Sequence, residues 1–308
     1  MAGLTEGLNA NVAKTALDKV FYQRYARLPG PQFTYAADEA VFQQDRSDRS
    51  AVIIEVFKGV GLWSNTPEQA EYQGDTPQVS DQITFTNIRF TKKFHITEEM
   101  IEDEKFSVVR NAVSQMGTKA SVTQNQQAMG IFRNSTGTTL TSDGIALLSA
   151  SHTNINGDTI DNTISAVMAV GTIEEGINLL VEQKDQAGDI VGHEAKTLLV
   201  PPALFREAVS ITESALEANT TDNNKNWVSS KYGIAIKQSQ YLGAAVGGSD
   251  IRYYMMGEYH SVMRFVRVPV QTKLLGPEYK DNGDTVYRGR FREVYGAISY
   301  EALVGYDG

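Results

Sequence analysis

Cysteine is absent from this 308-residue chain. Its absence excludes disulfide bonds, thiolate metal ligands and cysteine nucleophiles together. Long hydrophobic runs are also missing. No stretch approaches the roughly 18 apolar residues of a membrane-spanning helix, and the first thirty residues hold no apolar segment of a secretory signal. We therefore expect a protein made in a reducing compartment, with no membrane partner.

Positive charge is scarce: 28 Lys and Arg stand against 37 Asp and Glu, giving a net charge of −9 and a pI of about 5.1. Nucleic-acid affinity comes mainly from cations that neutralise phosphates, so tight DNA binding is not expected. One basic concentration occurs in "YRGRFRE", where Arg288, Arg290 and Arg292 share one strand face opposite Phe291 and Glu293. We interpret this face as solvated or salt-bridged, with a phosphate contact as the alternative.

Catalytic and metal-binding motifs are missing as well. "GVGLWS" at residues 59–64 lacks the third glycine of a dinucleotide loop, and no helix pattern follows it. The acidic cluster "EEMIEDE" could hold Mg²⁺ or Ca²⁺ weakly, but it fits better a helix start whose acids interact with the dipole. The histidines are scattered without the spacing of metal ligands: His95, His152, His193 and His260. We predict no catalytic, metal or cofactor site, and no enzyme.

The composition itself, 41% hydrophobic and 21% charged, is that of a globular chain with one large or two smaller domains. Residues 1 to about 30 predict an irregular arm with a short helix, ended by Pro29 and Pro31. "SAVIIEVFKGVGLW" at residues 50–63 is rich in β-branched residues and predicts a buried strand. Pro67 and Gly74 interrupt regular structure in the polar stretch that follows.

A return strand is predicted over residues 83–96. Its apolar positions change phase near Asn87, which predicts a bulge or twist there, because a one-residue shift turns the buried side chains to the other face. The apolar positions are Ile83 and Phe85 before the change, and Ile88, Phe90, Phe94 and Ile96 after it. Such a two-stranded arm could leave its own body and lie on something else.

A long helix is predicted from Thr97, a good N-cap, to about Phe132. Its apolar stripe recurs at helical spacing, and Gly117 weakens it locally. Two further helices and several strands follow, and Asn282-Gly283 indicates a hairpin turn between the last long strands. The order of elements predicts the α+β class.

The order of these parts resembles the major capsid proteins of tailed bacteriophages with the HK97-type fold, especially the Mu-like head-subunit branch. Four stretches carry the resemblance: "LWSNTPEQAEYQGDTPQVSDQITFTNIRFTKKFHITEEMIEDEKFSVVRNAVSQMG", "SDGIALLSASHTNINGD", "GINLLVEQKDQAGDIVGHEAKTLLVPPAL" and "GDTVYRGRFREVYGAISY". They resemble, in turn, the family's extended loop with its spine helix, its Leu/Phe-Ser-x-x-His-x-Asn segment, its axial domain and its closing peripheral strand.

The resemblance implies a subunit that forms the hexamers and pentamers of an icosahedral head enclosing double-stranded DNA. It assigns the parts as follows: N-terminal arm and lead-in, residues 1–56; extended loop, 57–96; peripheral domain with spine helix, 97–165; axial domain, 166–264; return strands of the peripheral domain, 265–308. It also implies a portal, a separate scaffolding protein, possible decoration by a further protein, weak contact with packaged DNA, and assembly in the host cytoplasm.

The extended loop would lie over a neighbouring subunit. We expect the inter-subunit contacts to involve Leu62, Trp63, Glu71, Tyr72, Asp75, Phe85, Arg288, Arg290 and Arg292. Shortening residues 66–80 should leave a folding subunit that builds no closed shell. Some members of the family cross-link through a loop lysine, but this chain has no lysine between Lys58 and Lys92. We therefore expect non-covalent stabilisation.

Three alternatives stay open at this point. A compartment shell of the encapsulin type would share the fold and differ in its cargo. Another virion structural protein, such as a tail tube, would share the lack of catalytic chemistry. An enzyme would need a clustered polar site, which the scattered histidines do not offer.

Overall fold

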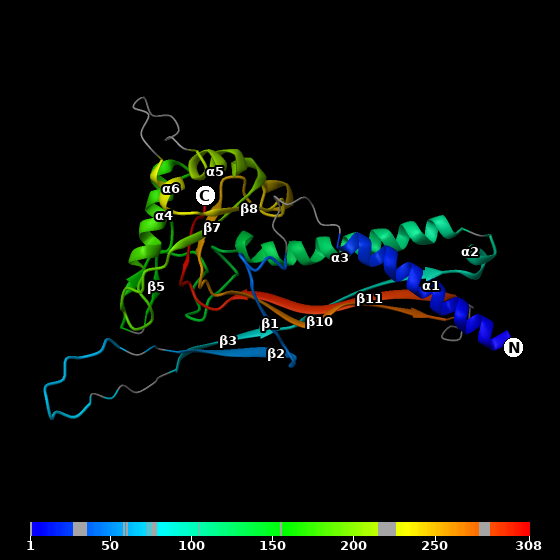
Figure 1. Ribbon diagram of the computed structural model, residues 1–308, viewed down its shortest axis with the longest axis horizontal. Helices are drawn as coiled ribbons and strands as arrows, with labels where there is room; N and C mark the ends of the chain where they lie inside the picture. The colour runs from blue at the N-terminus through cyan, green and yellow to red at the C-terminus, as the bar shows by residue number, and fades with distance from the viewer. Residues whose placement is uncertain are drawn as a thin grey trace.

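The computed structural model describes residues 2–26, 36–57, 59, 61–72, 74, 79–103, 105–154, 156–214, 226–276 and 284–308. The subunit is elongated (Figure 1). A compact block of helices and short strands forms one end, and a layer of long helices over long strands extends from it to the other end. A separate hairpin lies below the long strands and continues into a loop that leaves the body.

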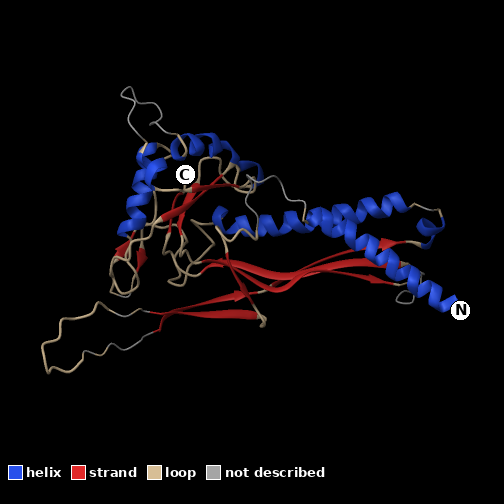
Figure 2. Cartoon of the chain, viewed as in Figure 1, coloured by secondary structure: helices blue, strands red, loops and turns tan. Residues whose placement is uncertain are grey.

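The long strands form a four-stranded sheet in the order β1-β10-β11-β4. Its members are β1 (Gln43–Arg46), β10 (Val262–Leu275), β11 (Thr285–Ala297) and β4 (Ile88–Ile96). β1 runs parallel to β10, and the other neighbours are antiparallel. Two helices, α3 (Phe106–Arg133) and α1 (Ala2–Tyr25), cover one face of this sheet (Figure 2). The turn expected at Asn282-Gly283 lies outside the described residues.

The predicted helix over residues 97–132 is present but divided. A short α2 (Glu98–Glu102) begins at Thr97, whose Oγ1 accepts a hydrogen bond from the Met100 N–H at 3.3 Å, so the predicted N-cap is confirmed. The chain then leaves the helical path at Lys105, where ψ is 39°, and α3 starts at Phe106. α3 buries Val109, Val113 and Met116 as the apolar periodicity predicts.

The prediction of an irregular N-terminal arm with a short helix was wrong, because α1 is a continuous helix of 24 residues. It crosses α3 and buries Phe21 against Val113, Met116 and Tyr287. Gly117 is the reason the two backbones can approach: a Cβ there would lie 2.5 Å from the Phe21 carbonyl oxygen. The glycine that weakens α3 locally therefore makes room for α1.

Gly117→Ala should destabilise the subunit by about 1–3 kcal/mol, because the added methyl group forces the two packed helices apart. The matched control is Gly130→Ala in the same helix, where a Cβ meets only the end of the Arg133 side chain at 3.6 Å. Without a clash, alanine there should stabilise the helix by up to about 1 kcal/mol. Denaturant unfolding of both variants measures the difference, and equal stabilities would contradict the close α1–α3 approach.

The compact block is built around a second sheet in the order β12-β9-β7-β8. Its strands are β7 (Ala195–Val200), β8 (Ala235–Gln238), β9 (Tyr253–Gly257) and β12 (Leu303–Tyr306), and its helices are α4 (Val170–Glu182), α5 (Phe205–Thr212) and α6 (Trp227–Lys231). Smaller elements are β5 (His152–Thr153), β6 (Thr159–Ile160), η1 (Pro202–Leu204) and η2 (Ala244–Val246). An apolar cluster containing Ile173, Ile177, Leu198 and Met255 packs α4 on this sheet.

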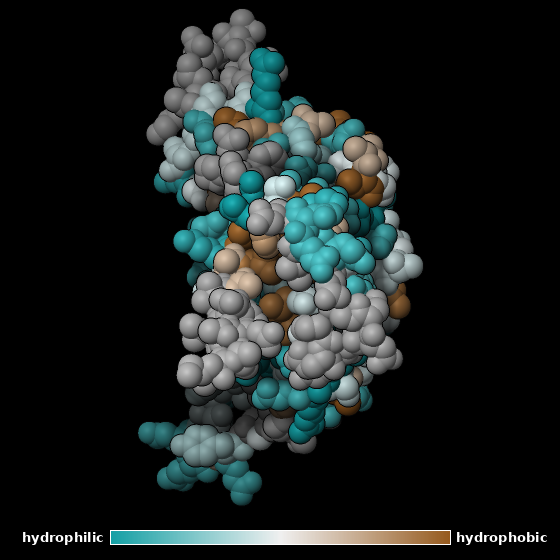
Figure 3. Space-filling model, turned by 90° about the vertical axis from the view of Figure 1, so that its right-hand side faces the viewer, coloured by the Kyte–Doolittle hydropathy of each residue, from teal (hydrophilic) through white to brown (hydrophobic). Residues whose placement is uncertain are grey.

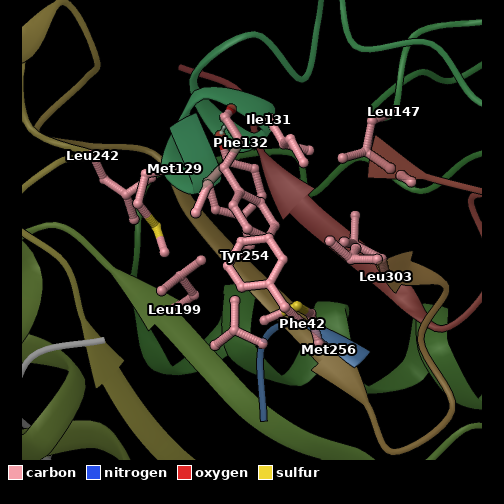
Figure 4. Packing of buried hydrophobic residues seen from close by; sticks show 14 of the residues in the cluster. Phe42, Met129, Ile131, Phe132, Leu147, Leu199, Leu242, Tyr254, Met256 and Leu303 are labelled. Carbon is pink, nitrogen blue, oxygen red and sulfur yellow. Dashed lines mark hydrogen bonds between the residues drawn. The ribbon is translucent and has the colours of Figure 1, made fainter. Parts of the chain in front are cut away.

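A larger apolar cluster joins the compact block to the long layer. Phe132, near the end of α3, packs on Tyr254 of β9 with ring centroids 5.0 Å apart, and Phe42 reaches Phe132 from the segment before β1. Figure 4 shows these rings side by side, with Leu199 and Met256 around them. Residues from the lead-in, α3 and the compact block share this core, so we expect the two parts to be rigidly connected.

The hairpin pairs β2 (Ala51–Phe57) with β3 (Val79–Thr86). The predicted irregularity near Asn87 is confirmed, and its cause is a change of sheet: β3 pairs with β2, whereas β4 pairs with β11. Asn87 is buried between them and donates from Nδ2 to the Ser47 Oγ at 2.8 Å and the Arg49 carbonyl at 3.0 Å. The single return strand predicted over residues 83–96 is therefore two strands in two sheets.

Candidate assembly surfaces

The hairpin and its loop form an arm that exposes apolar side chains. On β2, Ile53 and Phe57 are more than half exposed. The strand predicted over residues 50–63 is present as Ala51–Phe57, and the described residues 61–72 are irregular. The prediction that this strand is buried was wrong, because all of its residues are half-buried or exposed. Two strands alone cannot bury both of their faces, so this part of the chain needs a covering surface from elsewhere.

Three apolar loop residues among the predicted inter-subunit contacts have side chains that are almost entirely exposed. Trp63 is fully exposed, Tyr72 is 97% exposed and Leu62 is 81% exposed. Glu71, predicted to be a polar contact, is exposed beside Tyr72. Asp75, the other predicted polar contact, lies outside the described residues. The loop is the narrow extension below the body in Figure 3, as it is in Figure 1.

Phe85, the fourth apolar residue among the predicted contacts, is buried within its own subunit. Its side chain is only 8% exposed, and its ring stacks on Phe265 with a centroid distance of 5.4 Å. It also lies directly over Gly296 of β11, where any Cβ would overlap the ring. Phe85 therefore fastens the base of the arm to its own subunit, and we do not carry it forward as a contact to another copy. The sequence could not reveal this, because the partner glycine is more than two hundred residues away.

The three arginines of β11 share one sheet face, as their alternation predicts. Arg288 and Arg290 are exposed and Arg292 is half-buried, while Glu293 on the opposite face is buried with Arg264. The register of the sheet adds three cations that sequence periodicity could not connect with them. The complete set, called the cationic face below, is Arg89, Lys93, Lys273, Arg288, Arg290 and Arg292.

A groove of about 820 Å³ lies at this part of the sheet. Five members of the cationic face line it, Arg89, Lys93, Lys273, Arg288 and Arg290, together with Lys14 of α1. Among the described residues no carboxylate forms an ion pair with any member of the cationic face. The Arg292 Nε is buried and makes no hydrogen bond within that part of the chain. Of the two forms of the sequence interpretation, solvated or salt-bridged, the exposed Arg288 and Arg290 fit the solvated one within the described residues.

Titratable groups elsewhere are buried separately rather than gathered in a site. His152 and Asp143 form a buried pair at 2.7 Å; burial acts to raise the pKa of Asp143, but hydrogen bonds from His152 and Thr141 lower it overall. Burial lowers the pKa of His260 to about 4. Within the described residues no three His, Asp or Glu side chains could hold a metal ion, and no described helix is long and apolar enough to cross a membrane.

Comparison with known proteins gives one family. A sequence profile described as "Phage capsid protein" matches residues 82–305, which is most of the chain. The match begins in β3 and ends in β12, so it includes α3, the compact block and three strands of the long sheet, β4, β10 and β11, but not β1. No curated protein sequence matches at a significant level.

Solved structures agree at the level of the fold. The mature capsid of bacteriophage PhiM1 gives a TM-score of 0.56 at 11% identity, covering 91% of this chain and 89% of that one. The capsid of cyanophage P-SCSP1u gives 0.54 at 12% identity, with 91% and 90% covered. A virus-like particle from Pyrococcus furiosus gives 0.52 at 10% identity, with 94% and 97% covered. The α+β, HK97-like fold expected from the sequence is confirmed, while the Mu-like branch stays a prediction.

Proposed function

The chain belongs to the phage capsid protein family, and from that premise we propose that it forms the hexamers and pentamers of an icosahedral phage head that encloses double-stranded DNA. The observation that carries the proposal is the arm. A subunit whose Trp63, Tyr72 and Leu62 all lie in water is incomplete alone, and a shell of identical copies supplies the missing partner many times over.

The energetic argument rests on apolar area. Burying a large apolar side chain that is otherwise exposed stabilises by about 1.5–3 kcal/mol. Three such side chains on each arm therefore contribute about 4.5–9 kcal/mol. The loss of motional freedom on association costs about 4–15 kcal/mol, so the polar contacts and the closure of the shell must supply the rest. The contact is repeated for every copy, so small energies per subunit suffice for a permanent assembly.

We assign the inter-subunit contacts to Leu62, Trp63, Glu71 and Tyr72 on the arm and to Arg288, Arg290 and Arg292 on the cationic face. The parts of the subunit follow the same scheme as before: lead-in to residue 56, arm over 57–96, peripheral domain over 97–165 and 265–308, axial domain over 166–264. The separation of the long sheet from the compact block (Figure 2) supports a division of this kind. Two bounds differ from the sheets: β4 belongs to the long sheet rather than to the arm, and β12 belongs to the sheet of the compact block.

The work of this subunit is geometric rather than catalytic. The buried His152–Asp143 pair is closed to solvent on the histidine side, so it has no route to a substrate. We propose that assembly takes place in the host cytoplasm with a separate scaffolding protein and a portal, that a decoration protein can be added outside, and that packaged DNA is held weakly because the chain carries a net charge of −9.

Negative-stain electron microscopy of the purified chain tests the proposal. We expect closed icosahedral particles, and a single band near 33.8 kDa when they are boiled in denaturant, because no loop lysine is available for a covalent link. Particles filled with an enzyme instead of DNA in infected cells would favour a compartment shell. A compact monomer that never assembles would reject both.

A further inference from the structure

β4 is an edge strand of the long sheet. The order of that sheet is β1-β10-β11-β4, and in the described part of the chain β4 pairs only with β11. The backbone N–H and C=O groups along its other edge therefore have no strand partner among the described residues. An edge of this kind can accept a further strand through main-chain hydrogen bonds.

A groove of about 610 Å³ lies between β4 and α3, and its volume is typical of a ligand-binding cleft. Its apolar lining comes from both elements. Phe90 and Phe94 of β4 are half-buried there, and Phe90 stacks on Phe291 of β11 with ring centroids 4.9 Å apart. On α3 the lining includes Ala112 and Ala120, whose small side chains leave space between the helix and the sheet.

The charged residues that line this groove are all cations: Lys92, Lys93, Lys119 and Arg290. No Asp or Glu is among the lining residues. Because side chains alternate along a strand, Phe90 and Phe94 share the side that faces α3, whereas Arg89 and Lys93 lie on the other side of the sheet. β4 therefore offers apolar side chains on one side and cations on the other.

The complementary partner of this edge is a strand that alternates carboxylates with large apolar residues. Its apolar side chains enter the groove below α3, and its carboxylates stand beside Arg89 and Lys93, where opposite charges on neighbouring strands stabilise pairing. The phosphate backbone of a DNA duplex matches the cations, but it has no apolar side chains to fill the groove. The observations thus favour a peptide over a nucleic acid.

No segment of this chain has the required alternation. Side chains on one face of a strand are two residues apart. Among the 37 acidic residues of the sequence only Glu102 and Glu104 have this spacing, and the residue between them is Asp103 rather than an apolar one. A second copy of β4 is also unsuitable, because its Arg89 and Lys93 repel those of the first copy. The partner strand therefore belongs to a different protein.

We propose that the free edge of β4 and the groove below α3 bind an extended segment of a second protein, in which Asp or Glu alternates with large apolar residues. The segment adds a strand to the long sheet. Main-chain hydrogen bonds hold its backbone, the groove holds its apolar side chains, and the cations select its charge. The site is one for a protein partner and not for contacts between copies, so it goes beyond the proposed function.

Peptide binding to the unassembled subunit tests the proposal. The probe is a short fluorescein-labelled peptide that alternates Glu with Val and has both ends capped, and fluorescence anisotropy measures its affinity. One control peptide has Lys in place of Glu. The other is N-methylated at alternate residues, which removes the N–H donors along one edge. Each control peptide should bind at least about tenfold more weakly, a loss of about 1.4 kcal/mol. Equal affinities for the Glu peptide and either control would overturn the proposal.

A variant that fills the groove tests the position of the site. Ala112→Leu places a larger side chain in the groove, so it should weaken binding of the Glu peptide at least about tenfold. The matched control, Asn111→Leu, adds the same side chain at an exposed position of α3 that does not line the groove, and it should bind normally. Thermal unfolding establishes that both variants fold. A folded Ala112→Leu that binds like the wild type would show that the peptide lies elsewhere.

A charge exchange tests the selection of the partner. Arg89→Glu with Lys93→Glu should lose the Glu peptide and gain the Lys peptide. The control, Lys19→Glu with Arg110→Glu, makes the same change in net charge at exposed positions outside the groove, and it should keep its preference for the Glu peptide. A folded Arg89→Glu, Lys93→Glu chain with unchanged preference counts against the site.

Two further results separate this inference from its neighbours. If a DNA duplex displaces the Glu peptide and binds wild type and Ala112→Leu equally well, the cations form a phosphate contact instead and the proposal fails. If wild-type chains form no particles, only the proposed function fails, because the peptide is measured on separate subunits.

Discussion

Replacing Glu293 by glutamine should destabilise the subunit by about 3–5 kcal/mol, the usual cost of leaving a buried charge without its partner. Glu293 is only 2% exposed, and its Oε2 accepts from the Arg264 guanidinium at 2.8 Å. The substitution keeps the shape of the side chain and removes its charge. Arg264, itself buried, is then left without its counter-ion.

The effect should extend beyond the pair because other elements are bonded to it. The Gln124 side chain of α3 donates to the Glu293 Oε2 at 3.1 Å, and the Tyr25 hydroxyl of α1 donates to the Gln124 Oε1 at 2.7 Å. The network thus connects both helices to the long sheet. We expect α1 to become less protected from hydrogen exchange in Glu293→Gln, in addition to the lower midpoint in denaturant.

The matched control is Asp103→Asn, which breaks the Lys105–Asp103 pair. That pair is equally short at 2.7 Å, but its side chains are more than half exposed. Exposed ion pairs contribute about 0–1 kcal/mol, so the change in unfolding free energy should be small. If the two variants lose similar unfolding free energy, burial does not increase the contribution of the Arg264–Glu293 pair to stability.

Deleting residues 62–72 should abolish closed shells while leaving a folded subunit. The segment contains the most exposed large apolar side chains of the arm, Trp63, Tyr72 and Leu62, and the exposed Glu71 that we place in the contact. Side chains that lie in water contribute little to the stability of their own subunit. We therefore expect the free energy of unfolding to change by less than about 1 kcal/mol and particle yield to fall below detection.

A single change in the same loop provides the control. Gln69 has a positive φ of 69°, a conformation that favours glycine. Gln69→Gly relieves that strain and keeps every proposed contact, so its particles should form in normal yield. Normal particles from the deletion would reject the assembly role of the loop. Failure of Gln69→Gly to assemble would instead point to the backbone path as the decisive feature.

Local patterns were sufficient where the deciding interaction is local. The change of phase around Asn87 marks a change of buried face, and the structure places the boundary between two sheets at that residue. The alternation of Arg288, Arg290 and Arg292 likewise predicts their common face. The N-cap at Thr97 depends only on the next three residues, and it too could be read directly.

Patterns failed where the partner is distant in the chain. α1 shows little apolar stripe: among its described side chains, those of residues 13–25, only Phe21 is buried, so its length could not be recognised. From the sequence, Gly117 only predicts a locally weaker helix. Its role in the close contact with the Phe21 backbone is visible only in the structure. From the sequence, Phe85 is predicted to contact another copy. Its packing on Gly296 of the same subunit is visible only in the structure. Arg89, Lys93 and Lys273 join the cationic face only through strand register.

Asn87 has a consequence for the direction of the arm. The chain passes between the long sheet and the hairpin twice, through residues 47–50 and through Asn87. The Asn87 Nδ2 ties the two crossings together, because it donates to the Ser47 hydroxyl and the Arg49 carbonyl. A tilt of a few degrees at this joint is magnified along the arm's length, so in the proposed shell we expect this amide to influence where the tip meets its neighbour.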